Sequence, residues 1–239
     1  MFAIARSELV QIFRNRSVLV SGLLMPVAAS IYFISSRDTF EERGSLGYIA
    51  AVLVFTIGAF GLYGTTVTTL AARRQNLFLK RLRSTAASDP EILSGLVLPI
   101  SVISLFQVTV LLGVFGAVSG SPADVALLVV AVASAFVMML ALGLATAGVT
   151  RSPEQSQVTA LPLSIGMVAV VSWIGITGTE QFALLKRLLP GGSAAELVID
   201  SWNGGVPRDE SLLLLAPTLA WVVVAIALGT KVFRWEPRR

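Results

Sequence analysis

Long apolar stretches separated by short polar segments dominate the chain. A membrane-spanning helix needs about 20 mostly apolar residues in a row. Six stretches reach this length, and they predict transmembrane helices over residues 17–36, 46–72, 92–119, 123–149, 157–177 and 212–230. The first stretch contains Pro26 and no A-x-A cleavage site follows it, so we expect a mature span and not a signal peptide.

Local signals support several of the predicted helix starts. Asp89-Pro90 is typical of an N-cap followed by proline in the first turn. Residues 152–155 (Ser-Pro-Glu-Gln) and 193–196 (Ser-Ala-Ala-Glu) have the spacing of capping boxes, in which a serine and an acidic or amide residue satisfy the free N–H groups of the first turn.

Composition agrees with a membrane protein and excludes several chemistries. The 239 residues are 55% hydrophobic and only 13% charged, whereas about a quarter of the residues in a soluble domain are charged. The chain contains no cysteine and no histidine. Disulfides, thiol nucleophiles, histidine metal sites and imidazole proton shuttles are therefore excluded.

The basic residues are distributed unevenly across the predicted spans. If both chain ends are cytoplasmic, 13 of the 18 Lys and Arg residues lie on the cytoplasmic side, and those on the other side are Arg37, Arg43, Lys186, Arg187 and Arg208. Cytoplasmic loops of membrane proteins carry an excess of Lys and Arg. We therefore predict cytoplasmic termini and a cytoplasmic loop between the second and third spans.

Apart from Asp124, the second residue of the fourth, the predicted spans contain no Asp, Glu, Lys or Arg. Proton-coupled carriers, pumps and voltage sensors usually keep such groups at membrane depth, which disfavours these classes; sodium coupling through carbonyls and hydroxyls stays open. The chain also has no G-x-x-x-x-G-K-[ST] phosphate loop and no hydrolase motif. If it moves a substrate uphill, we expect the energy to come from elsewhere and not from a nucleotide site of this chain.

A short basic segment, residues 73–88, separates the second span from the third. It has no proline or glycine, and Phe78, Leu79 and Leu82 recur at helical spacing, which predicts a helix with an apolar stripe. The residues leave two interpretations open: an anchor for anionic lipid headgroups, or a docking helix for a cytoplasmic protein. The candidate docking residues are Arg74, Leu77, Phe78, Leu79, Lys80, Arg81, Leu82 and Arg83.

Residues 180–204 form neither a clean span nor an ordinary loop. Phe182, Leu185 and Leu189 fall at helical spacing before the break at residues 190–192 (Pro-Gly-Gly), and a second apolar helix is expected after it. This pattern predicts either a re-entrant hairpin in the outer leaflet, which requires cover by protein or a wet cavity, or a pair of surface helices in the headgroups.

These segments together resemble a known family. The start, from Glu8-Leu9 to Arg16-Ser17, is similar to an interfacial helix that enters a first span. Residues 79–85 (Leu-Lys-Arg-Leu-Arg-Ser-Thr) match an L-x-x-L-R-x-T pattern, followed by Asp89-Pro90 before the third span. The whole chain resembles a membrane subunit of the type-2 ABC transporter permease family. Ala86 departs from the proline that many members have there.

The resemblance implies an architecture. We expect an all-α membrane protein with six transmembrane helices, an interfacial helix at residues 1–16, a cytoplasmic coupling helix at 73–88 and a re-entrant outer-leaflet hairpin at 180–204. The second and fifth spans would face the axis between two protomers. Candidate lining residues of a substrate pathway are Phe55, Phe60, Tyr63, Thr66, Met167 and Trp173, although hydroxyls and small residues also serve ordinary helix packing.

The function implied is that of a permease subunit of an ATP-driven exporter in the plasma (inner) membrane. It would move an amphipathic drug or antibiotic, or a lipid, outward. The expected partners are an ABC ATP-binding subunit, a second copy of the chain or a homologous permease, and membrane lipids, but no nucleic acid. ATP and Mg would bind in the partner, and this chain would bind no cofactor. The alternatives are an ATP-independent carrier or channel and a non-transporting membrane scaffold.

Overall fold

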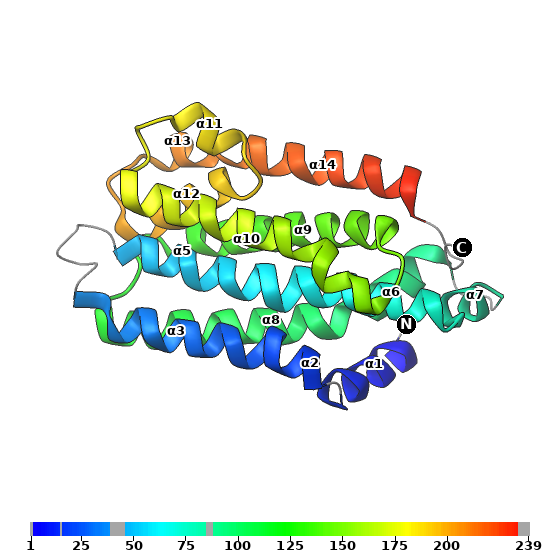
Figure 1. The fold of residues 1–239 in the computed structure, drawn as a ribbon. Coiled ribbons are helices and arrows are strands. Elements are labelled where there is room, and N and C mark those ends of the chain that lie inside the picture. The colour runs from blue at the N-terminus through cyan, green and yellow to red at the C-terminus, as the bar shows by residue number, and fades with distance from the viewer. Residues whose placement is uncertain (1, 15, 39–45, 85–87, 234–239) are drawn as a thin grey trace.

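The computed structural model of the chain describes residues 2–14, 16–38, 46–84 and 88–233, and all regular structure within these ranges is helical. The long helices lie side by side along one common axis, as Figure 1 shows. The predicted all-α fold is therefore confirmed.

Within the described residues, five helices are long and apolar enough to cross a membrane. They are the continuous helix Leu46–Gln75, made of α5 (Leu46–Thr56), η2 (Ile57–Gly64) and α6 (Thr65–Gln75), then α8 (Asp89–Ser119), α9 (Val125–Val149), α10 (Pro153–Thr177) and the helix Arg208–Val232, which contains α13 (Arg208–Leu212) and α14 (Leu215–Val232). They coincide with the second to sixth predicted spans.

The first predicted span is also helical but less regular. It consists of α2 (Arg16–Leu19), the π-helix η1 (Val20–Leu24) and α3 (Met25–Ser35), and its apolar part, Gly22–Ser35, is shorter than the other spans. A separate helix, α1 (Phe2–Arg14), precedes it at the position expected for the interfacial helix. Whether this first run crosses the membrane as a sixth span stays a prediction.

The expected start signals are partly confirmed. At α8 the N-cap is Ser88 and not Asp89, because the Ser88 N–H donates to the carboxylate of Glu91 at 2.9 Å. At α10 the Ser152 hydroxyl accepts the N–H of Gln155 at 3.4 Å, as predicted. The predicted capping box at residues 193–196 is wrong, because the helix there already begins at Gly192.

The helix Leu46–Gln75 forms the centre of the bundle. Its apolar window is 83% buried, compared with 56% for α9 and 17% for the last helix. It packs against α3, α8, α9 and α10, so its side chains meet protein on all sides. The outer helices turn large apolar side chains such as Phe106, Val158 and Val223 outward, as expected for surfaces in contact with lipid.

The two ends of the bundle carry different elements. At one end lie α1, the short helix α7 (Phe78–Arg83) and the C-terminal end of α14 (Figure 1). At the other end lie α11 (Ala183–Leu188), α13 and the N-terminal end of α5 (Figure 1). This grouping agrees with the predicted topology, in which both chain ends and the 73–88 segment share one side of the membrane.

Candidate functional site

The basic segment between the second and third spans is less uniform than predicted. Helix α6 continues through Arg73 and Arg74 to Gln75, and the chain turns before α7 begins at Phe78. The turn places Leu77 in the left-handed region, with φ 60°. The predicted single helix over residues 73–88 is therefore corrected to the end of α6, a turn and the short helix α7; residues 85–87 lie outside the described ranges.

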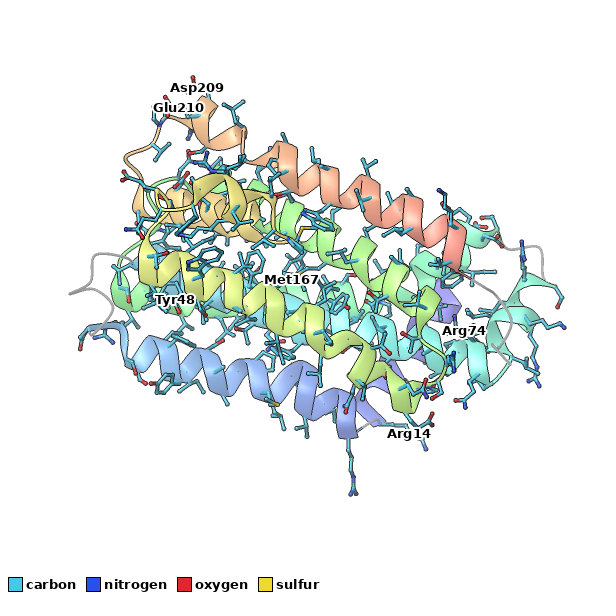
Figure 2. All side chains as sticks on the ribbon, turned by 45° about the horizontal axis from the view of Figure 1, so that its top comes forward. Arg14, Tyr48, Arg74, Met167, Asp209 and Glu210 are labelled. Atoms are coloured by element: carbon cyan, nitrogen blue, oxygen red, sulfur yellow. The ribbon has the colours of Figure 1, made fainter. Side chains whose placement is uncertain are left out.

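Arg74 is an internal side chain and not a docking residue. It is only 1% exposed, and its guanidinium donates to the carbonyls of Ala147, at 3.0 Å, and Thr150. These carbonyls lie at the C-terminal end of α9, where backbone acceptors lack helical partners and the helix dipole favours a cation. Arg74 thus caps α9 at the α7 end of the bundle, where Figure 2 labels it.

The apolar stripe of α7 faces its own bundle. Leu79 is fully buried in a cluster with Leu70, Ile92 and Leu96, and Phe78 and Leu82 pack against that cluster while half-buried. The expectation that Leu79 anchors a partner is therefore corrected, because its surface is already covered. Four candidate docking residues remain exposed and form what we call the docking surface: Leu77, Lys80, Arg81 and Arg83.

Leu77 is the unusual member of this surface. It is a leucine in the left-handed backbone region, and its side chain is 41% exposed. Left-handed backbone costs an L-residue other than glycine roughly 1–2 kcal/mol, and a leucine that is 41% exposed gains only part of the stabilisation that full burial gives. Such strain persists mainly at functional positions, and the basic neighbours Lys80 and Arg81 give the surface a positive charge.

The predicted pathway residues do not line an open route in this chain. Phe55, Tyr63, Thr66 and Met167 are completely buried in the bundle, and only Phe60 and Trp173 are partly exposed. The Tyr63 hydroxyl donates to Thr146 at 3.1 Å, and Met167 lies in the middle of the bundle (Figure 2). The expectation for these four residues is corrected: they pack helices together in this conformation.

A helix break at the predicted place is confirmed, but it covers residues 189–191, one residue earlier than predicted, and separates α11 from α12 (Gly192–Asn203). Helix α12 packs among α5, α9, α10 and α14, and residues 192–199 are all buried. This burial contradicts the interpretation of α12 as a surface helix. Its C-terminal carbonyls also accept the N–H groups of Ala123, at 3.1 Å, and Asp124, at 2.9 Å, which precede α9.

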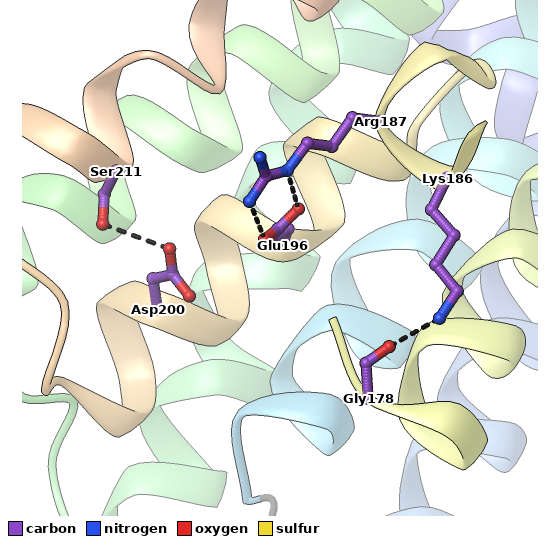
Figure 3. A network of polar contacts seen from close by, with 6 residues as sticks. All are labelled: Gly178, Lys186, Arg187, Glu196, Asp200 and Ser211. Atoms are coloured by element: carbon purple, nitrogen blue, oxygen red, sulfur yellow. Dashed lines mark hydrogen bonds and ion pairs between the residues drawn. The ribbon is translucent and has the colours of Figure 1, made fainter. Parts of the chain in front are cut away.

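Polar contacts fasten α11 to its surroundings (Figure 3). The Arg187 guanidinium donates to both carboxylate oxygens of Glu196 on α12, at 2.8 and 2.7 Å, and these bonds raise the pKa of Arg187. Lys186, 1% exposed, donates to the Thr177 hydroxyl at 2.7 Å and the Gly178 carbonyl at 2.6 Å, at the end of α10. These two adjacent cations therefore hold one short helix against both α12 and α10.

The same end carries a second, exposed pair. Asp124 caps α9 by accepting the Leu127 N–H at 3.0 Å and also pairs with Arg208. The backbone hydrogen bond, and after it the contact with Arg208, lowers the pKa of Asp124. Asp124 stays ionised down to a pH below the usual range of an aspartate.

The sequence did not reveal several of the polar contacts in this structure. Glu8 of α1 is buried against Arg73, 65 positions away. The only local signal for this pair was one carboxylate in an otherwise basic and apolar first helix. Lys186 and Glu196 likewise gave no sign in the sequence that they are internal, because a charged residue between apolar neighbours is equally common on the exposed side of an amphipathic helix.

The fold defines a multi-pass membrane protein with a short basic helix, α7, at one end of the bundle and the buried helix α12 near the other end. A model of the ABC-2 type transporter family matches residues 1–173, so the chain belongs to that family. The matched domain is the membrane permease component of type-2 ABC transporters and not the ATPase. The comparison with curated proteins gives no match.

Proposed function

We propose that the chain is the permease subunit of an ATP-driven exporter. Members of the ABC-2 family usually work with an ATP-binding subunit and form dimers, and this chain has no phosphate loop of its own. In the proposed complex, two permease chains, identical or homologous, pair with two ATP-binding subunits that hold ATP and Mg. The permease lies in the plasma membrane, crosses it six times and has both termini in the cytoplasm.

The docking surface carries this proposal. It lies at the end of the bundle that also holds α1 and the end of α14 (Figure 1), which the basic residues assign to the cytoplasm. An exposed leucine beside cations suits a partner groove that has an apolar floor and an acidic rim. When ATP closes the ATPase pair, α7 moves with it, and the helices that it contacts, α6 and α8, change the access of the pathway.

The substrate class follows from the absence of charge at membrane depth. Buried polar side chains along the central and third spanning helices, such as Thr66, Ser104 and Gln107, are neutral. A groove of about 560 Å³ between α8 and α9 is lined mostly by apolar side chains, and one of about 570 Å³ between α8, α9 and α14 is apolar except for Asp89 and Thr230 at its α7 end. These features support an amphipathic drug or antibiotic, or a lipid, more than an ion or a sugar.

Affinity purification from native membranes tests the proposal. We expect a tagged chain to retain an ATP-binding subunit and magnesium-dependent ATP hydrolysis, and to lose both after a wash that strips peripheral proteins. Robust hydrolysis by the stripped chain, or its recovery without any ATP-binding protein, would count against an ATP-driven exporter and favour a carrier, a channel or a scaffold.

A further inference from the structure

A buried ion pair connects the first helix to the end of the second spanning helix. The Arg73 Nη2 donates to Glu8 Oε2 at 2.8 Å, and Arg73 Nε lies 2.7 Å from Glu8 Oε1. The side chains are 2% exposed for Glu8 and 12% for Arg73. The same Nη2 also donates to the side-chain carbonyl of Gln11, one turn further along α1. Arg73 therefore binds side chains on two successive turns of α1.

The same guanidinium also lies over the ring of Phe78 in α7. Its central carbon lies 5.4 Å from the centroid of the Phe78 ring, within the range of a cation–π interaction. Phe78 is the first residue of α7, directly after the left-handed turn at Leu77. Arginine can do this because its planar group forms bidentate bonds at the edge and stacks on a ring at the face. One side chain thus contacts α1 and α7 at once.

The packing of the helices makes this contact distinctive. Helix α1 packs mainly on α8, while α7 packs on α6 and α8. Most contacts of α1 and α7 are therefore with the spanning helices. Arg73, near the end of α6, is the side chain that contacts both α1 and α7. Stability alone explains the pair poorly, because burying two charges costs about as much as their attraction returns, and apolar residues of similar volume often serve as well.

We propose that Arg73 is a positioning residue that joins α7 to α1, with Glu8 as its anchor. A displacement of α7 then moves α1 with it, and the motion reaches the segment that leads into the first spanning run. We call these contacts of Arg73 with Glu8 of α1 and Phe78 of α7 the joint, and they lie entirely within this chain. Its use in transmitting ATPase movement rests on the proposed function.

Spin-label distance measurements on the purified chain test the joint. The chain has no cysteine, so Arg6→Cys on α1 and Ser84→Cys after α7, both exposed, give one labelled pair. The unaltered joint should give one narrow distance distribution. Glu8→Gln removes the anchoring charge, Arg73→Lys removes the two-pronged contact, and Phe78→Leu removes only the ring. Each should broaden or shift the distribution, with Phe78→Leu acting even though the ion pair remains.

A second labelled pair, Ser121→Cys with Val206→Cys, reports on the opposite end of the bundle and should stay unchanged in all three variants. Arg14→Gln is the matched control, because it removes an exposed cation from α1. If the three variants leave the first distribution as narrow as before, α1 and α7 are not joined through Arg73. Equal broadening of both pairs would mean that Arg73 only supports the fold, which also contradicts the proposal. Since no ATP-binding subunit is present, neither result depends on the proposed function.

Discussion

Replacing Gly192 with alanine is expected to destroy the packing of α11 against α12. A Cβ atom at this position would lie 1.7 Å from the carbonyl oxygen of Lys186 and 2.7 Å from its carbonyl carbon. Both atoms belong to the backbone, so no side-chain rotation relieves the clash. Helix α11 would have to separate from α12, which breaks the contacts of Arg187 with Glu196 and those of Lys186 with the end of α10.

The expected cost is on the order of 4 kcal/mol, which is exceptional for one added methyl group. In a chain of this size that corresponds to a fall in Tm of roughly 10 °C, measured by thermal unfolding of the purified protein in detergent. Gly166→Ala is the matched control, because a Cβ there meets no atom within 4 Å and α10 gains helix propensity. A Gly192→Ala protein with the Tm of the unaltered chain would show that the turn is not as tight as described.

Leu77→Asn is expected to separate partner binding from stability. Asparagine tolerates the left-handed backbone better than leucine does, so the chain should be as stable as before or slightly more so. The exposed apolar side chain is lost, however, and truncating an anchor at the centre of an interface typically costs about 2 kcal/mol or more, roughly a thirtyfold loss of affinity. The purified variant should therefore melt normally yet lose the proposed ATP-binding subunit.

Arg81→Gln provides the comparison on the same surface. A charge at the rim of an interface mainly affects the association rate and its dependence on salt. This variant should bind the subunit at low ionic strength and release it at high ionic strength. If the Leu77→Asn variant binds the subunit normally while the Arg81→Gln variant fails to bind it at every ionic strength, the surface acts through charge only. The proposal that Leu77 is an apolar anchor is then wrong.

Hydropathy predicted the long helices well because lipid imposes the same requirement along the whole length of a span. In the part of the chain that the structure describes, all five helices of spanning length lie where apolar runs were found. The ends were less predictable, since caps depend on single side-chain contacts. Ser88 caps α8 in place of Asp89 because its N–H and hydroxyl both meet Glu91.

The direction of side chains at the candidate site could not be predicted from spacing. The periodicity of α7 correctly put Phe78, Leu79 and Leu82 on one side, but it does not distinguish burial in the same chain from burial in a partner. Leu79 is buried in its own chain. Arg74 looked like part of a solvated basic cluster, yet it caps α9, whose end lies more than 70 positions away in sequence.

The buried pair of Glu8 and Arg73 illustrates the same limit. A contact over 65 positions leaves no local pattern. The lining of a substrate pathway could not be predicted for a related reason. Small and hydroxyl-bearing side chains favour close helix packing as much as they favour a substrate route. Phe55 and Tyr63 of the central helix are fully buried, since that helix is surrounded by the others.

Site-specific photo-crosslinking in native membranes tests the central claim most directly. A crosslinking residue at position 77 should form an adduct with the ATP-binding subunit. One at position 182 should not, although Phe182 is also exposed and left-handed, because it lies just before α11 at the other end of the bundle. An adduct from position 182 and none from position 77 would contradict docking at α7 and the account of ATP-driven transport built on it.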